Sequence, residues 1–138
     1  MKRTHMVLGA CFLLTAAVAL PADIKVIANS SVSSSSISTD ELKDVFLLTK
    51  NSFGGGHAEP VLEKGGAAHE AFVKSYLGKS DTALQTYYRS LVFTGKASMP
   101  KTLGTDADVV AYVAKTKGAI GYVSAGASTE GVKTLEVK

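Results

Sequence analysis

Apolar and polar residues follow one another along this chain with two different periods, and these predict two kinds of element. In four segments the apolar residues recur every three or four positions, which is the spacing of one face of an α-helix. These segments begin near Ser38, Ala68, Ser80 and Thr105. Shorter apolar runs, typical of β-strands, cover residues 23–28, 60–62, 119–123 and 132–137. The order of elements predicts an α/β fold with a mixed sheet and 132–137 as an edge strand.

Polar residues at the expected ends support the helices. Ser38 with Glu41, and Thr105 with Asp108, have the spacing of a capping box. The helix after Thr105 is followed by Gly118, which can take the left-handed conformation that closes a helix. The helix after Ser80 carries a regular apolar stripe that we expect to be buried, made of Leu84, Tyr87, Tyr88, Leu91 and Val92.

The segments between these elements carry few chemical signals. Residues 29–36 are rich in serine, and two interpretations stay open: a solvated loop, or a ligand loop beyond the carboxyl end of a strand. Gly54-Gly55-Gly56 lacks the Gly-Lys-Ser/Thr ending of a phosphate-binding loop, so we expect a turn. His57 and His69 have too few partners at ligand spacing for a metal site, and we expect both at the surface. Residues 96–104 are expected to form a loop.

The first residues have the pattern of a secretory signal peptide. Lys2 and Arg3 precede an uncharged, largely apolar run from Met6 to Leu20, which is too short to span a membrane, and Ala22 is a plausible cleavage point. The alternative is a lipoprotein signal at Leu8-Gly9-Ala10-Cys11. We therefore expect a leader at residues 1–22, a single domain at residues 23–138, no membrane span in the mature chain, and a periplasmic or secreted location.

Charge and cysteine content narrow the function classes. The chain has 15 Lys and Arg, 12 Asp and Glu, and one Cys. Two of the basic residues belong to the expected leader, which leaves a mature net charge of +1 and gives no argument for a nucleic-acid partner. Cys11 would leave with the leader, so thiol chemistry and a disulfide are not expected. No cofactor motif is visible.

Two motifs carry a family resemblance. Gly118-Ala119-Ile120-Gly121-Tyr122-Val123 resembles the "pGAIGYv" segment of the periplasmic phosphate-binding proteins of ABC transporters, and Phe93-Thr94-Gly95 with Pro100 resembles another segment of that family. The resemblance covers most of residues 24–125. It implies one α/β lobe of a type II periplasmic binding protein, three-layer-like, with a mixed sheet flanked by about four helices, in a short single-lobe member. The family's glycine after the first helix is absent from Phe46-Leu47-Leu48-Thr49-Lys50, so that turn is expected to differ.

The resemblance also places a ligand site. In the family, an Arg and a Ser-Gly-Thr-like triplet at a strand-to-helix junction hold the anion. Here Gly66, Ala67 and Ala68 stand at the triplet, with Glu63 and Lys64 near the Arg position. Only backbone N–H groups could bind an anion there. Ser30 and Ser31 could donate from the serine-rich loop, and Arg89 is either a solvated helix charge or an anion clamp. These six residues are the candidate ligand-binding set.

Two function classes follow. The first is a solute-binding module that holds an oxyanion or another small solute weakly. The second is an interaction module whose pocket is lost and which docks on an ABC permease or another envelope protein. An enzyme is not expected, because no Ser-His-Asp, Cys-His or paired-carboxylate arrangement is visible in the sequence. A retained anion contact would favour the first class, and an exposed apolar patch the second.

Overall fold

A computed structural model describes residues 24–138, so the expected leader and its cleavage site lie outside the described residues. The fold is built on a six-stranded mixed sheet with the order β2-β8-β1-β7-β5-β6. The central strands β1, β7 and β5 are joined by antiparallel β1–β7 and parallel β5–β7 pairing. The strands of this sheet are β1 (Ile24–Ala28), β2 (Ser36–Ile37), β5 (Glu59–Glu63), β6 (Lys101–Leu103), β7 (Ala119–Ser124) and β8 (Lys133–Val137).

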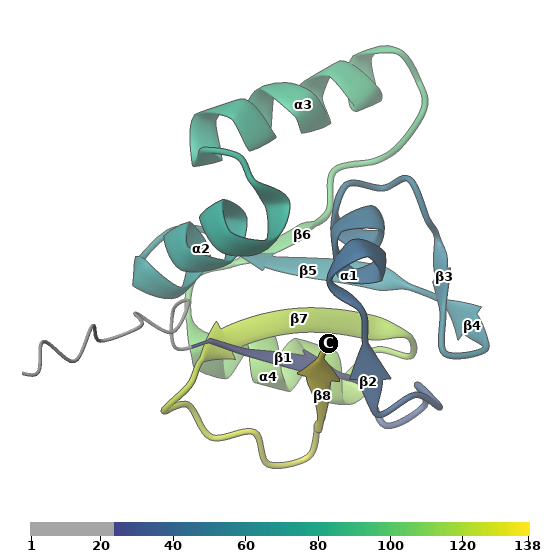
Figure 1. The fold of residues 1–138 in the computed structure, drawn as a ribbon, viewed down its shortest axis with the longest axis vertical. Coiled ribbons are helices and arrows are strands. Elements are labelled where there is room, and N and C mark those ends of the chain that lie inside the picture. Colours follow the sequence, from purple (N-terminus) through teal and green to yellow (C-terminus); the bar gives the residue numbers. More distant parts are fainter. Residues whose placement is uncertain (1–23) are drawn as a thin grey trace, which may run out of the picture.

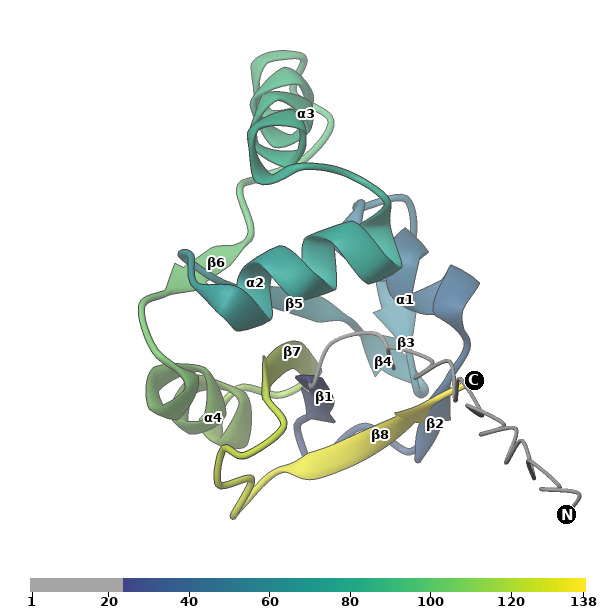
Figure 2. The ribbon, with the colours of Figure 1, turned by 60° about the vertical axis from the view of Figure 1, so that its left-hand side comes forward.

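Four α-helices surround the sheet. The helices α1 (Thr39–Phe46) and α2 (Ala67–Phe72) lie over one face, and α4 (Asp106–Lys115) covers the other (Figures 1 and 2). A π-helical segment, Val73–Leu77, continues α2 and ends at Gly78 in the left-handed conformation. The helix α3 (Asp81–Phe93) projects away from the sheet. The three-layer α/β architecture expected from the sequence is therefore confirmed.

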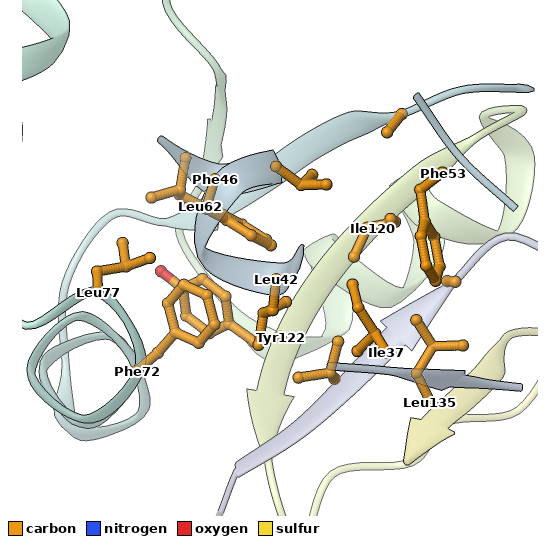
Figure 3. Close-up of a cluster of buried hydrophobic side chains, with 14 of the residues drawn as sticks. Ile37, Leu42, Phe46, Phe53, Leu62, Phe72, Leu77, Ile120, Tyr122 and Leu135 are labelled. Atoms are coloured by element: carbon orange, nitrogen blue, oxygen red, sulfur yellow. The ribbon is translucent and has the colours of Figure 1, made fainter. Parts of the chain in front are cut away.

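Side chains of the sheet alternate between two hydrophobic clusters because successive residues of a strand point to opposite faces. Val26 and Tyr122 belong to the larger cluster, under α1 and α2, whereas Ile27 and Val123 belong to the smaller one, under α4. In the larger cluster the Tyr122 ring stacks on Phe72 with centroids 4.0 Å apart (Figure 3). Both clusters lie within residues 24–137, so this segment contains the buried apolar surface that a domain needs.

The predicted helix starts are confirmed. The hydroxyls of Ser38, Ser80 and Thr105 accept hydrogen bonds from the backbone N–H groups three residues on, each at 3.1 Å. Gly118 takes the left-handed conformation with φ 77°. The helix α4 ends earlier, at Lys115, so Gly118 serves the turn into β7 and does not close the helix directly.

Two sequence predictions were wrong in detail, and two expected turns are present. The two-residue strand β2 pairs outside β8, so β8 is not the edge strand. Residues 101–103 form the edge strand β6 inside the expected loop. The Gly54-Gly55 turn joins a small hairpin of β3 (Ser52–Phe53) and β4 (Gly56–His57). After α1, Leu48 has φ 61°, so the chain makes a left-handed turn without glycine. Such short elements carry too few residues for a periodic signal.

The stripe of α3 is buried only over its first half. Leu84 and Tyr88 are buried, and the hydroxyls of Tyr87 and Tyr88 donate to the backbone oxygens of Leu47 and Phe46 at 2.6 and 2.5 Å. Leu91 is half-buried and Val92 is exposed. The sequence prediction failed at Val92 because periodicity shows which residues share a helix face, not how far a partner surface extends along that face.

Candidate functional site

The strand-to-helix junction between β5 and α2 corresponds to the anion-binding position that the resemblance implies. Gly66 precedes α2 with φ 95°, and no side chain caps the helix. Gly65, Gly66 and Ala67 are exposed, whereas Ala68 is buried. The first N–H groups of any helix lack partners within it and attract negative charge. The junction therefore offers backbone donors and no hydroxyl.

A carboxyl pair lies directly before this junction. Glu63 is 5% exposed, its Oε1 has no hydrogen-bond partner, and its side chain is hydrogen-bonded to Asp106, the first residue of α4. Burial and the neighbouring Asp106 raise the pKa of Glu63 to about 8. The hydrogen bond with Glu63 in turn lowers the pKa of Asp106, which also accepts from the Ser124 N–H at 3.2 Å. At neutral pH Glu63 is therefore mainly protonated and donates to the Asp106 carboxylate.

This protonation state changes the electrostatics inferred from the sequence. From the sequence, Glu63 is expected to repel a dianion at this junction unless another group pairs with it. Asp106 is such a partner, and near pH 7 the single negative charge of the pair resides on Asp106. This carboxyl pair is not visible in the sequence. The two residues are 43 positions apart, and only the packing of α4 beside the end of β5 brings them together.

A second buried polar chain holds the first turn of α2. His69 is 1% exposed, which corrects its expected surface position. Its Nε2 lies 2.7 Å from Asp81 Oδ1, and its Nδ1 contacts the Tyr122 hydroxyl. The same hydroxyl accepts from the Glu63 N–H at 3.0 Å. The arrangement fits a neutral imidazole that donates to Asp81 and accepts from Tyr122.

The hydrogen bonds from Asp81 to His69 and from His69 to Tyr122 connect the same residue types as a catalytic relay. The burial of His69 and Tyr122 indicates a structural role instead. Tyr122 is fully buried and burial raises the pKa of its phenol, so the hydroxyl neither ionises readily nor meets a substrate. Its bonds join β5, β7, α2 and the start of α3. Sequence reasoning missed these hydrogen bonds, although His69 stands three and four residues before the apolar Phe72 and Val73 and could have been placed on the inner face.

The serine-rich loop is organised by a residue that sequence reasoning did not single out. Asn29 is buried, and its Nδ2 donates to the backbone oxygens of Val113 and Ala114 at 2.7 and 3.1 Å, while its Oδ1 accepts from the Ser31 N–H at 2.9 Å. Ser31 Oγ accepts from the Gly118 N–H at 3.1 Å. The start of this loop is therefore tied to the end of α4.

Ser31 lines a hollow of about 400 Å³ together with His57, Lys117 and the glycine-rich hairpin. Ser30 is exposed beside it. The strand register places this loop far from Gly66: Ala28 pairs with Ile120 at one end of β7, whereas β5 continues from Pro60, also beside Ile120, toward the opposite end. Arg89 lies exposed on α3. The six candidate residues thus occupy three separate places.

No described group of three or more His, Cys, Asp or Glu side chains could hold a metal ion. None of the described helices is both long and apolar enough to span a bilayer.

Comparison with known proteins identifies the fold. No protein-family model matches the chain. No curated protein matches it either. Several solved structures match the chain. A putative phosphate ABC transporter substrate-binding protein with bound phosphate, from Clostridium perfringens, is 16% identical with a TM-score of 0.63, over 83% of this chain and 44% of its own. PstS from Borrelia burgdorferi is 11% identical with a TM-score of 0.62, over 84% and 47%.

An ABC-type phosphate transport receptor from Vibrio cholerae is 12% identical with a TM-score of 0.56, over 83% of this chain and 46% of its own. The chain therefore spans less than half the length of these solved structures, and at this identity the likeness concerns the fold. These neighbours are transport receptors and substrate-binding proteins. The described residues have the α/β fold of about half of a phosphate ABC transporter substrate-binding protein.

Proposed function

We propose that this chain is an exported, solute-binding-like protein that holds a small oxyanion weakly at the start of α2. The observation that supports the proposal is the junction itself: it has the position and fold of the anion site that the resemblance implies, with exposed Gly66 and Ala67 N–H groups and no side-chain donor. Export is inferred from residues 1–22, and an ABC permease is the corresponding partner.

The same geometry makes the binding weak. The resemblance implies an anion site with side-chain donors, namely hydroxyls and a guanidinium, whereas this junction has backbone donors alone. Each charge-assisted hydrogen bond that is lost costs about 1.5–3 kcal/mol. Losing two or three of them moves a micromolar Kd into the millimolar range. The Asp106 carboxylate adds a negative charge behind the junction. We therefore expect millimolar phosphate binding by residues 23–138.

Site-resolved amide NMR tests this proposal. Phosphate is titrated into the millimolar range at constant ionic strength, with chloride as the matched control. Saturable shifts at Gly66, Ala67 and Ala68 are expected. Shifts confined to Ser31 and Lys117 would transfer the site to the hollow near the serine-rich loop. A micromolar Kd, or the absence of any phosphate-specific shift, would contradict weak binding at α2.

The second candidate function is an interaction module that docks on another envelope component. One observation favours it: the end of α3 exposes large apolar side chains, with Phe93 92% exposed. This candidate needs no anion, so it survives a negative phosphate titration. Crosslinking in intact cells through a photoreactive residue at position 93, with one at exposed Ala111 on α4 as a control, would identify a protein partner.

A further inference from the structure

The exposed end of α3 is the surface that the fold leaves unexplained. Among the described residues, the large hydrophobic side chains classed as exposed are Val92 at 43%, Phe93 at 92% and Met99 at 46%. All three lie within eight positions, on the last turn of α3 and in the loop that follows. Burial of a phenylalanine in an apolar environment is worth about 1.5–3 kcal/mol, so a fully exposed one at the end of a projecting helix indicates a contact made outside the domain.

The end of α3 belongs to a projecting helix and borders a hollow. The first half of α3 is held to the body by the buried Leu84 and Tyr88, whereas Val92 and Phe93 at its end are exposed. The helix as a whole projects from the sheet (Figure 2). Thr94 and Gly95 close its carboxyl end through backbone bonds to Ser90 and Val92. The apolar side chains therefore lie on a structured projection.

Cations flank the apolar side chains in the sequence. Arg89 precedes Phe93 by one helical turn, Lys96 follows Val92 by the same interval, and Lys101 lies just beyond Met99. Between Asp81 and Asp106 the sequence has these three cations and no carboxylate. Asp81 is 12 residues before Phe93, or about 18 Å along the helix at about 1.5 Å per residue, and it is engaged by His69.

The hollow beside this projection is also lined by lysine side chains. Lys96, Met99 and Lys101 line a cavity of about 530 Å³ together with Lys50. Lys50 is paired with Glu41 at 2.6 Å, and Lys101 Nζ lies 5.5 Å from the centre of the Tyr112 ring. Arg89 and Lys96 are therefore the cations that we assign to the end of α3.

We propose that this tip, defined as Arg89, Val92, Phe93, Lys96 and Met99, binds the surface of an anionic lipid bilayer. Apolar side chains at the apex with flanking cations match the boundary between acyl chains and headgroups. A bilayer also needs no complementary groove to receive a projecting helix end. Symmetric pairing of two copies through the tip would instead bring Arg89 and Lys96 of both copies together, which like charges oppose. The proposal does not depend on oxyanion binding at α2.

The sequence offers a clean reporter because it contains no tryptophan. Phe93→Trp in residues 23–138 places a single indole at the apex of the tip, and Ala111→Trp places one on exposed α4 as the matched control. Vesicles of equal parts phosphatidylglycerol and phosphatidylcholine are compared with vesicles of phosphatidylcholine alone. We expect the indole emission of the Phe93→Trp variant to shift to the blue with the anionic vesicles and to return when salt is added. The emission of the Ala111→Trp variant should not shift.

Vesicle co-sedimentation of the otherwise unchanged residues 23–138 measures the same contact without the indole. Phe93→Ser is expected to lower the partition coefficient about tenfold, and Lys96→Gln about fivefold. Both positions are exposed, so circular dichroism should show an unchanged fold. No sedimentation with anionic vesicles at low salt would overturn the proposal, as would equal binding to neutral vesicles. Concentration-dependent dimerisation that Phe93→Ser abolishes, with no vesicle binding, would assign the tip to a second copy instead.

Discussion

Replacing Glu63 with glutamine should make the protein less sensitive to alkaline pH. The protonated Glu63 side chain is buried and donates to Asp106, with its Oε1 unpaired. Glutamine keeps the size of the side chain, stays neutral at every pH, and retains a donor for Asp106. The substitution therefore removes the titration of this group while leaving most of its contacts in place.

The sign and size of the effect follow from linkage. The pKa of Glu63 is raised from 4.5 to about 8 on folding. The folded chain therefore binds more protons than the unfolded chain between these values, and its free energy of unfolding falls as pH rises. The slope is about 1.4 kcal/mol per pH unit, so Glu63 removes on the order of 3 to 5 kcal/mol of stability between about pH 5 and pH 9. That stability is fully present below pH 4.5 and lost as pH rises through 8. The lowered pKa of Asp106 acts at more acidic pH and in the opposite direction.

Urea unfolding followed by far-UV circular dichroism at several pH values measures the difference. We expect the two proteins to be similar at about pH 5 and the Glu63→Gln variant to be the more stable by on the order of 3 kcal/mol at about pH 9. Glu70→Gln, which removes an exposed carboxylate from the neighbouring helix α2, is the control. Parallel curves for Glu63→Gln and the unchanged chain across this range would refute the assignment of a protonated, buried Glu63.

Two further substitutions test the packing around the site. Gly118→Ala should destabilise the fold by more than about 2 kcal/mol, because φ is positive and a Cβ would lie 2.0 Å from the His57 carbonyl oxygen; Gly126→Ala, with open space around it, is the control, and equal melting temperatures would contradict the close contact. Tyr122→Phe should cost about 2–4 kcal/mol, since it leaves His69 and the Glu63 N–H without their partner. A loss no larger than about 1 kcal/mol in urea unfolding would show that water replaces the hydroxyl.

The elements whose apolar residues recur at regular spacing could be predicted from the sequence. The helices from Ser38, Ser80 and Thr105 each combine an apolar face with a capping residue, and the structure has all three caps. Strands such as β7 carry enough consecutive apolar residues to be recognised. Local signals of this kind survive folding because the tertiary structure uses the same faces that the periodicity marks.

The polar groups around α2 could not be predicted in the same way. Glu63 and Asp106, and His69 and Tyr122, are brought together by the crossing of elements distant in sequence. A single sequence shows a charged residue at the end of a strand without showing what covers it. Its pKa and its effect on an anion depend on that cover. The sequence therefore could not give the protonation state of Glu63, whereas the absence of hydroxyl donors can be read directly from residues 66–68.

The two motifs that carry the family resemblance have different roles in packing. Gly118 and Gly121 are required by close approaches to the His57 carbonyl and to Val109, and Tyr122 holds the junction through its hydroxyl. Packing accounts for this motif completely, so it predicts the fold and says little about a ligand. Phe93 is different, because its exposed side chain contributes almost nothing to the packing of the domain. A residue that belongs to a recognisable motif and has no role inside the fold is best explained by a contact outside it, and the cations beside Phe93 define the charge of that contact.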